Sequence, residues 1–431
     1  MKNVKIKVNI NHICLTIILF MLLWHYGFTS YFGNYYQIEE TGKIIISSNV
    51  IINSISKILS LLSYISCVFL CFNYFVRKRK VTKLEFIYIL IFLNMLIILF
   101  FKTTNPLSIL FDLGKWNNRM GIITVIACSI FFYGANESDW KFIKKIICIF
   151  VFLSAILVFI ILLTKPEIYQ KRLYAYKWLH GFGVIVRLGV WIFILNNRKS
   201  KLASLFVLIV DIIMIIVLQA RLYVVDFLLQ LIFICILLIK NRYSNRKDKL
   251  YKKIVRILKT SIVFFTIFII VLFMPNSKMF NMFPKSVQTS LTFFSERLTE
   301  DTRTAQAQGF FEYFWDSFPI GVGYNTDGIP PGVGESGIDC GYLNTMYIAG
   351  VLMVVLLIFL TVIPILKTWF YKQKVEDIAV ISRATTWIII LFSSASTGFE
   401  IEFMFFILCA GRCSKLNRFR NKKNSVCEVI Q

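Results

Sequence analysis

The chain contains few of the residues from which metal and disulfide sites are built. Among 431 residues there are three histidines and ten cysteines, and no group of His, Cys, Asp or Glu has the spacing of metal ligands. All the cysteines except Cys340 fall in expected membrane spans or on the cytoplasmic side, which excludes a disulfide framework outside the cell membrane. We therefore expect no metal site and no cofactor.

Charged residues are also scarce, at 16% of the chain, whereas hydrophobic residues make up 57% and the mean hydropathy is +0.70. These values lie outside the range of soluble globular proteins. The net charge of +25 would suggest a nucleic-acid partner in a soluble protein. Here the lysines and arginines gather in short links between apolar runs, so they indicate membrane topology and no nucleic-acid binding.

Apolar runs of about 20 residues, the length that crosses the hydrocarbon layer, recur along the whole sequence. We expect an all-α, polytopic integral membrane protein with about 12 transmembrane helices, in which residues 1–431 form a single membrane domain. The expected spans are Ile13–Phe28, Ile58–Val76, Leu84–Phe101, Met120–Tyr133, Phe142–Leu163, Gly181–Leu195, Leu202–Leu218, Leu222–Ile239, Ile257–Met274, Tyr342–Leu366, Thr385–Ala395 and Phe399–Ala410.

The distribution of basic residues sets the expected orientation of these spans. With the N-terminus inside, most of the 48 lysines and arginines lie in cytoplasmic links, among them Arg77–Lys83 and Lys240–Lys259. No small-residue cleavage site follows Phe28, so the first apolar run is expected to be an uncleaved anchor. The predicted location is the cytoplasmic (inner) membrane of a bacterial cell, with both termini in the cytoplasm and membrane lipid as a partner.

One outer segment, residues 275–341, is longer than an ordinary connection and is the expected large extracytoplasmic loop. Its glycines and prolines predict tight turns, and GVGESG is no dinucleotide site because no strand precedes it and no nucleotide reaches that side. Phe310, Phe311, Phe314, Trp315 and Phe318 share one face of a predicted helix. That face either lies at the membrane interface, where a lipid-linked substrate would pass, or packs on the transmembrane bundle.

Five arginines lie where the positive-inside pattern does not place them. Arg187 and Asp211 lie at matching depths in neighbouring spans, which predicts a structural ion pair. Arg221 lies in the short outer turn LQARLYVVD, at the depth of lipid headgroups, where a guanidinium could bind phosphate or merely anchor a helix end. The remaining three are Arg172, Arg297 and Arg303.

The order of these features resembles that of the Wzy-type polymerases of O-antigen and capsule polysaccharide and of the related O-antigen ligases. The resemblance runs from about Arg172 to Leu366. It rests on KRLYAYKWLHGFGVIVRLG, LQARLYVV, SERLTEDTR, FPIGVGYN and DCGYLNTMYIAG, which occur in the family's order and on the expected sides of the membrane.

The resemblance implies roles for individual residues. Arg221, Arg303 and Arg172 correspond to the arginines that hold the diphosphate of the substrate. The ligases begin the motif that ends at Gly350 with a histidine, and Asp339 stands in its place, which favours a polymerase. Asp339, or Glu335 before it, is then the catalytic base, although Asp339 could also cap the following helix. The family's tryptophan after the loop arginine is absent, with Ala307 near its position.

The predicted function is therefore that of a membrane glycosyltransferase. It would join undecaprenyl-diphosphate-linked oligosaccharide units on the outer face of the membrane, with a chain-length regulator and a flippase as further partners. Two alternatives remain: an O-antigen ligase of the same fold, and a lipid-linked oligosaccharide transporter, although the sequence shows no paired halves of the kind found in transporters.

Overall fold

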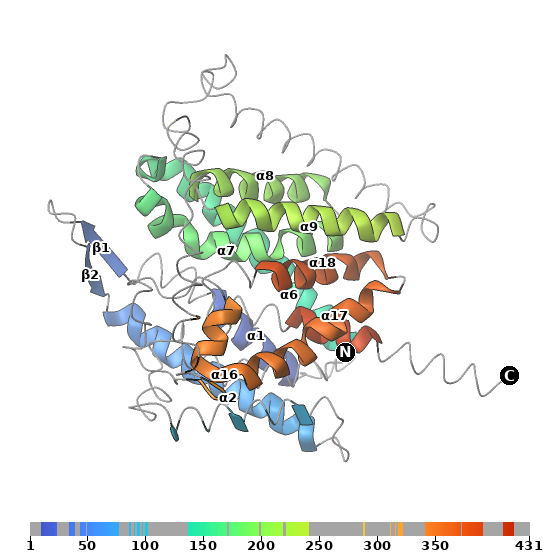
Figure 1. Cartoon of the computed structure of the whole chain (residues 1–431). Helices are drawn as coiled ribbons and strands as arrows, with labels where there is room; N and C mark the ends of the chain where they lie inside the picture. The colour runs from blue at the N-terminus through green and yellow to red at the C-terminus, as the bar shows by residue number, and fades with distance from the viewer. Residues whose placement is uncertain are drawn as a thin grey trace, which may run out of the picture.

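A computed structural model describes the parts of the chain that form its helices and one hairpin (Figure 1). The described residues are 10–23, 34–38, 44–48, 50–76, 137–169, 172–197, 200–218, 221–240, 341–371, 373–390 and 408–417, with single positions in 86–101 and at 288, 311, 315 and 318–321. Of the remaining residues nothing structural is stated.

The described part of the chain is almost entirely helical, as the sequence predicts. Its helices are α1 (Ile10–Leu23), α2 (Val50–Val76), α6 (Glu137–Thr164), α7 (Arg172–Asn196), α8 (Lys201–Leu218), α9 (Arg221–Lys240), α16 (Gly341–Leu360), α17 (Val362–Trp369) and α18 (Val375–Ile390), with a 3-10 turn, η3, at Pro166–Tyr169 and a helical segment at 408–417. Four helical stretches are long and apolar enough to cross a membrane: Glu137–Thr164, Lys201–Leu218, Tyr223–Lys240 and Gly350–Trp369, the last of which comprises the end of α16 and the whole of α17.

The helical class is confirmed for the described residues, and these four stretches are consistent with a membrane protein, whereas the number of twelve spans stays a prediction. The expected bounds of α8 and α9 agree with the structure to within one residue at each end. Four other helices begin at least five residues earlier than expected: α2 at Val50 instead of Ile58, α6 at Glu137 instead of Phe142, α7 at Arg172 instead of Gly181, and α18 at Val375 instead of Thr385. Polar residues in their first turns explain these differences, because a search for apolar runs passes over them.

The expected span Tyr342–Leu366 is divided into α16 and α17. Gly350 interrupts α16 with φ 83° and ψ 169°, and Thr361 separates α16 from α17. The side-chain oxygen of Thr361 donates a hydrogen bond to the carbonyl of Leu357, as a threonine inside an apolar helix commonly does. This region is therefore a broken helix rather than one straight span.

Helix α7 lies at the centre of the bundle and packs against α6, α8 and α18, while α9 packs against α18 (Figure 1). Small residues permit the close approach of its neighbours. A Cβ atom at Gly183 would lie 2.1 Å from the sulfur of Met214, and one at Gly189 would lie 2.2 Å from a methyl of Val151. The largest fully buried side chains in the described part are Trp140, Trp191, Trp387, Arg383 and Phe227.

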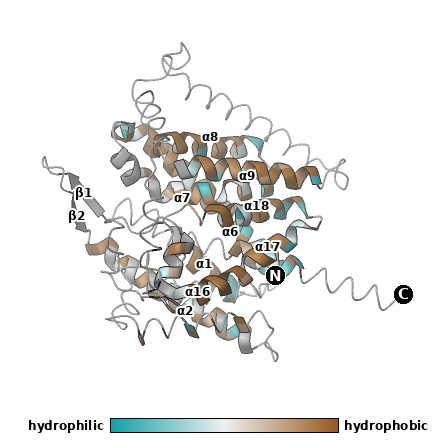
Figure 2. Ribbon diagram, in the orientation of Figure 1, coloured by the Kyte–Doolittle hydropathy of each residue, from teal (hydrophilic) through white to brown (hydrophobic). Residues whose placement is uncertain are grey.

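The outward faces of the helices are apolar as well. Figure 2 shows that α8 and α9 are hydrophobic along most of their length. Val50 and Phe72 on α2, Leu163 on α6 and Leu202 on α8 are all more than half exposed. Such side chains would be unfavourable in water and are expected where a helix faces lipid.

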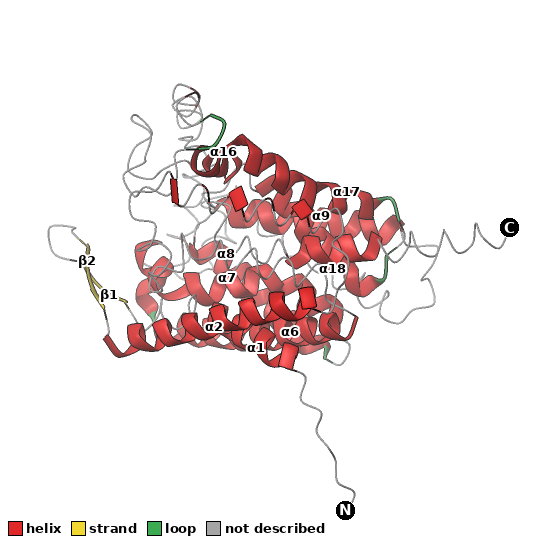
Figure 3. Cartoon of the chain, turned by 90° about the horizontal axis from the view of Figure 1, so that it is seen from below, coloured by secondary structure: helices red, strands yellow, loops and turns green. Residues whose placement is uncertain are grey.

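One departure from the all-α prediction lies between α1 and α2. Strands β1 (Asn34–Ile38) and β2 (Ile44–Ser48) form an antiparallel hairpin in which Asn34 pairs with Ser48 and Ile38 with Ile44. The hairpin projects from the helices in both views (Figure 1, Figure 3). The runs NYYQI and IIISS are rich in β-branched and aromatic residues, which favour a strand in a segment too short to cross a membrane.

Candidate functional site

The predicted site residues fall into two groups. Arg303, Glu335 and Asp339 lie outside the described residues, so the diphosphate-binding and catalytic roles predicted for them stay predictions. Arg172 and Arg221 lie within the described backbone, where each is the first residue of its helix, α7 and α9 respectively. At the N-terminus of a helix the backbone N–H groups and the helix dipole favour a nearby anion.

The outer segment is docked on α16 by a short turn. The backbone N–H of Val351 donates a hydrogen bond of 3.0 Å to the carbonyl of Pro319. A Cβ atom at Gly350 would lie 2.2 Å from that carbonyl oxygen and 2.4 Å from the carbonyl carbon of Ile320, and the φ of 83° is itself unfavourable for other residues. Two motifs that lie apart in the sequence, the FPIG turn and the end of DCGYLNTMYIAG, therefore meet at one point.

Three aromatic residues of the predicted helix face lie within the described residues, and all three are exposed. Phe311, Trp315 and Phe318 are 61%, 73% and 49% exposed, and the rings of Trp315 and Phe318 contact each other edge to face at 5.6 Å. Burial of this face against the bundle was one of the two expectations from the sequence. The exposure favours the other, in which the aromatic side chains lie at the membrane interface.

One cation–π contact and one aromatic contact show the register of α7 and α9. The guanidinium of Arg187 lies 3.8 Å from the centre of the Tyr223 ring, and Trp191 and Phe227 are 5.6 Å apart between ring centres. Both pairs have the same offset in residue number, so α7 and α9 run parallel, and Arg221 lies level with Ile185. Along a straight helix Arg172 would then lie about 20 Å from that level, at 1.5 Å per residue.

The diphosphate-binding roles predicted for Arg172 and Arg221 stay predictions. Each residue begins a helix, and the register of α7 and α9 separates the two helix starts by about 20 Å along the axis if α7 is straight.

Directly below the start of α9 lies a buried group of charged residues, which we call the core charge cluster: Arg187, Asp211, Asp226 and Arg383. All four are at most 4% exposed. Arg383 of α18 donates hydrogen bonds of 2.7 and 2.9 Å from Nη1 to the two carboxylate oxygens of Asp226 of α9. Its Nε donates to the carbonyl of Leu188 at 3.2 Å, and its Nη2 donates to the carbonyl of Arg187.

The predicted partner of Arg187 needs correction. Its Nε lies 3.8 Å from a carboxylate oxygen of Asp226, and no direct ion pair joins it to Asp211 among the described residues. Asp211 belongs to the same cluster and interacts electrostatically with Arg187, Arg383 and Asp226. Counting residues along a helix predicts depth, and all of these residues do lie at a similar depth. It does not predict which side of α7 faces which neighbour, and that decides the pairing.

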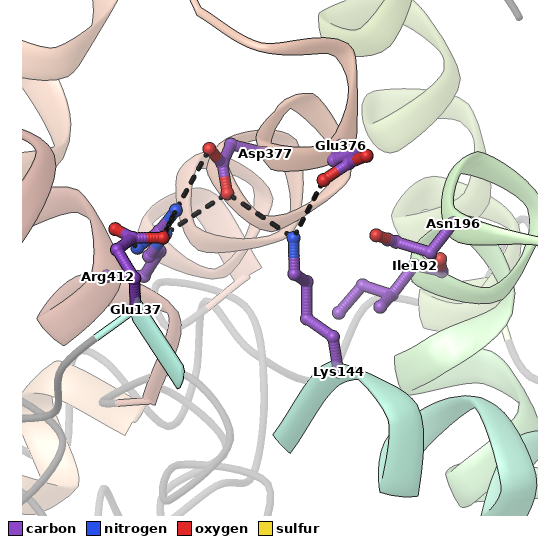
Figure 4. A network of polar contacts seen from close by, with 7 residues as sticks. All are labelled: Glu137, Lys144, Ile192, Asn196, Glu376, Asp377 and Arg412. Carbon is purple, nitrogen blue, oxygen red and sulfur yellow. Dashed lines mark hydrogen bonds and ion pairs between the residues drawn. The ribbon is translucent and has the colours of Figure 1, made fainter. Parts of the chain in front are cut away.

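A second polar network lies where α6, α18 and segment 408–417 meet, at the end of the bundle that the expected topology places in the cytoplasm (Figure 4). Arg412 donates hydrogen bonds of 3.1 and 3.2 Å to Asp377 and of 2.6 and 3.3 Å to Glu137. Lys144 lies 3.5 Å from Glu376 and 3.9 Å from Asp377. Asp377 thus lies between the two cations.

Electrostatics keep this second network charged. Burial works to lower the pKa of the Arg412 guanidinium, but the charge of Asp377 and hydrogen bonds to Glu137 and Asp377 outweigh it, so the pKa is raised. The guanidinium also lies 5.4 Å from the centre of the Trp140 ring. Beside this network, His12 of α1 lies 3.2 Å from Asp139 of α6. The network therefore joins the first and last parts of the described chain.

The sequence interpretation did not single out Asp226, Arg383 or Arg412. Asp226 lies in the expected span Leu222–Ile239, and an acidic residue in a span is the signal that could have found it. Arg383 lies just before the expected span Thr385–Ala395, because the polar start of α18 hides the true beginning of the helix. Arg412 follows the last expected span, Phe399–Ala410, and nothing in the sequence sets it apart from the other basic residues there.

Among the described residues no group of three or more His, Cys, Asp or Glu could hold a metal ion. No family model and no curated protein matches the chain.

Proposed function

We propose that the chain is a polysaccharide repeat-unit polymerase. In this proposal it transfers a growing oligosaccharide from its undecaprenyl diphosphate carrier to the next lipid-linked repeat unit, on the outer face of the cytoplasmic membrane. The product would be an O-antigen or capsule polymer. A flippase would deliver the repeat unit and a chain-length regulator would act on the product.

The observation that carries the proposal is the docking of Pro319 on the break at Gly350. A transferase that acts on a lipid-linked sugar needs its outer segment fixed against the membrane, because reacting groups must be held within a near-attack geometry. The hydrogen bond between Val351 and Pro319 supports this, because it holds the Pro319 turn at Gly350, the first residue of a stretch long and apolar enough to cross a membrane. Asp339 precedes α16 by two residues, so docking would also restrain its position.

The chemistry requires neither a metal nor a nucleotide. The oxygen of an acceptor hydroxyl attacks the anomeric carbon, the bond from that carbon to the diphosphate oxygen breaks, and the lipid diphosphate leaves with the electron pair. The proton of the hydroxyl passes to a carboxylate, for which Asp339 is the proposed base and Glu335 the second candidate. Arg221 and Arg303 would stabilise the charge that develops on the leaving diphosphate.

Arg172 has a separate place in this proposal. A polymerase binds two lipid-linked molecules, a donor and an acceptor, and the distance along α7 separates Arg172 from Arg221 by more than one diphosphate. We assign Arg221 to the leaving diphosphate and Arg172 to an anionic group further from the reacting bond.

The deciding experiment uses the purified full chain with lipid-linked repeat units in detergent. A polymerase converts them to products of two or more units with release of lipid diphosphate, without added metal or nucleotide. A ligase would leave single units unchanged until a lipid acceptor of another kind is supplied. A transporter would make no longer product under any condition, and that result with folded protein would overturn the proposal.

A further inference from the structure

Asp211 is the member of the core charge cluster whose carboxylate has no hydrogen bond. Asp211 is 1% exposed, and neither of its carboxylate oxygens accepts a hydrogen bond from the described residues. It lies in α8 between Val210 and Ile212, inside one of the four helices that are apolar and long enough to cross a membrane. An acidic residue in such a place requires a physical explanation.

The hydrogen bonds of Arg383 are directed elsewhere. Its Nη1 donates to both oxygens of Asp226, its Nε to Leu188, and its Nη2 to the carbonyl of Arg187. The carboxylate of Asp226 also accepts a hydrogen bond of 3.3 Å from the side-chain amide of Gln230. The closest contact between a guanidinium and a carboxylate in this cluster is therefore the one between Arg383 and Asp226.

Arg187 is likewise oriented toward α9. Its guanidinium lies over the Tyr223 ring at 3.8 Å, and its Nε is 3.8 Å from Asp226. The positive charges of Arg187 and Arg383 therefore act on Asp211 without a hydrogen bond and favour its ionised form. The negative charge of Asp226 opposes that form. Helix α6, which also packs on α8, carries its charged residues between Glu137 and Lys145, at the far end from the cluster.

An ionised carboxylate that is fully buried and accepts no hydrogen bond is strongly destabilised, and such a group takes up a proton instead. We propose that Asp211 is a proton-binding site in the membrane interior, occupied at neutral pH. The proton removes the buried negative charge and gives the carboxyl a donor. The core charge cluster then holds two guanidinium groups and one carboxylate, so it carries one net positive charge beneath Arg221.

The test compares Asp211→Asn with Asp226→Asn in the full chain, purified in detergent. Asparagine matches a protonated aspartic acid in shape and charge, so Asp211→Asn should keep the melting temperature of the wild type at neutral pH. The Asp226→Asn variant removes the hydrogen-bonded carboxylate of the cluster, so its melting temperature should fall by several degrees.

Infrared spectroscopy gives the direct readout. The wild type should show the carbonyl stretch of a buried protonated carboxyl, which is lost in Asp211→Asn and retained in Glu137→Gln, a control whose carboxylate is 45% exposed and belongs to the second polar network. An identical band in the wild type and Asp211→Asn would overturn the proposal. So would a melting temperature of Asp211→Asn as low as that of Asp226→Asn, or failure of Asp211→Asn to fold, because an uncharged isostere would then not replace the native group.

Discussion

Arg383 of α18 donates two hydrogen bonds, 2.7 and 2.9 Å long, to the carboxylate of Asp226 of α9, and both side chains are 1% exposed. Because Arg383 also bonds the backbone of α7 at Leu188, three helices that are not adjacent in sequence are joined by one side chain. Its removal is therefore expected to affect the whole bundle.

Replacing Arg383 by Met should destabilise the protein by about 3–5 kcal/mol, since the carboxylate of Asp226 would stay buried without its cation. Replacing Asp226 by Leu should destabilise the protein by a similar amount, because the guanidinium of Arg383 would then stay buried without its carboxylate. The double replacement Arg383→Met with Asp226→Leu should be less destabilised than either single variant, because no buried charge of the pair then lacks a partner. Thermal unfolding of the purified variants measures this. A double variant whose loss of stability equals the sum of the two single losses would contradict the pairing of Arg383 with Asp226.

Gly350→Ala should release the outer segment from α16. The new methyl would meet the carbonyl of Pro319, and the left-handed φ of 83° adds backbone strain of about 1–2 kcal/mol. Under the proposed function, polymer length should fall while the protein remains in the membrane. Leu352→Ala is the matched control, since this neighbouring residue is 53% exposed and has an ordinary helical place in α16. Faster proteolysis between Gly321 and Gly341 in Gly350→Ala alone reports the loss of docking.

Arg221→Ala should abolish polymer while single-repeat products and membrane levels of the protein stay normal, and Arg303→Ala should do the same. Arg221→Lys should restore little activity, because lysine cannot bind a phosphate through two parallel hydrogen bonds. The readout is the length distribution of the surface polysaccharide. Chain lengths like those of the wild type in both alanine variants would rule out the diphosphate clamp.

The two acidic partners of Arg412 should differ in their contribution. Asp377 is 1% exposed in its side chain, so Asp377→Asn should destabilise by about 3–5 kcal/mol, as expected for a broken buried pair. Glu137 is 45% exposed, and Glu137→Gln should cost less than about 1 kcal/mol because solvent screens that contact. Melting temperatures of the two variants, measured side by side, test the difference. Equal losses would mean that exposure does not control the energetics of this network.

Residue patterns predicted the helical membrane class and the positions of α8 and α9, because apolar runs of the correct length have few other uses. They also predicted that Arg187 would meet a carboxylate. They did not predict that Asp226 would be that carboxylate or that Arg383 would join it, because pairing across a bundle depends on the rotation of each helix and on contacts far apart in the sequence. For the same reason, residue patterns did not predict that Pro319 would contact Gly350.

The hydrogen bond from Val351 to Pro319 has a consequence for how the outer segment could vary. It closes the intervening chain into a loop whose two ends lie at one point on the membrane protein. Lengthening such a loop adds only a slowly growing entropic cost, about 0.6 kcal/mol for each doubling. Insertions between Gly321 and Gly341 should therefore leave the anchoring point unchanged, so this part of the chain could be lengthened or replaced without disturbing the helices that hold its ends.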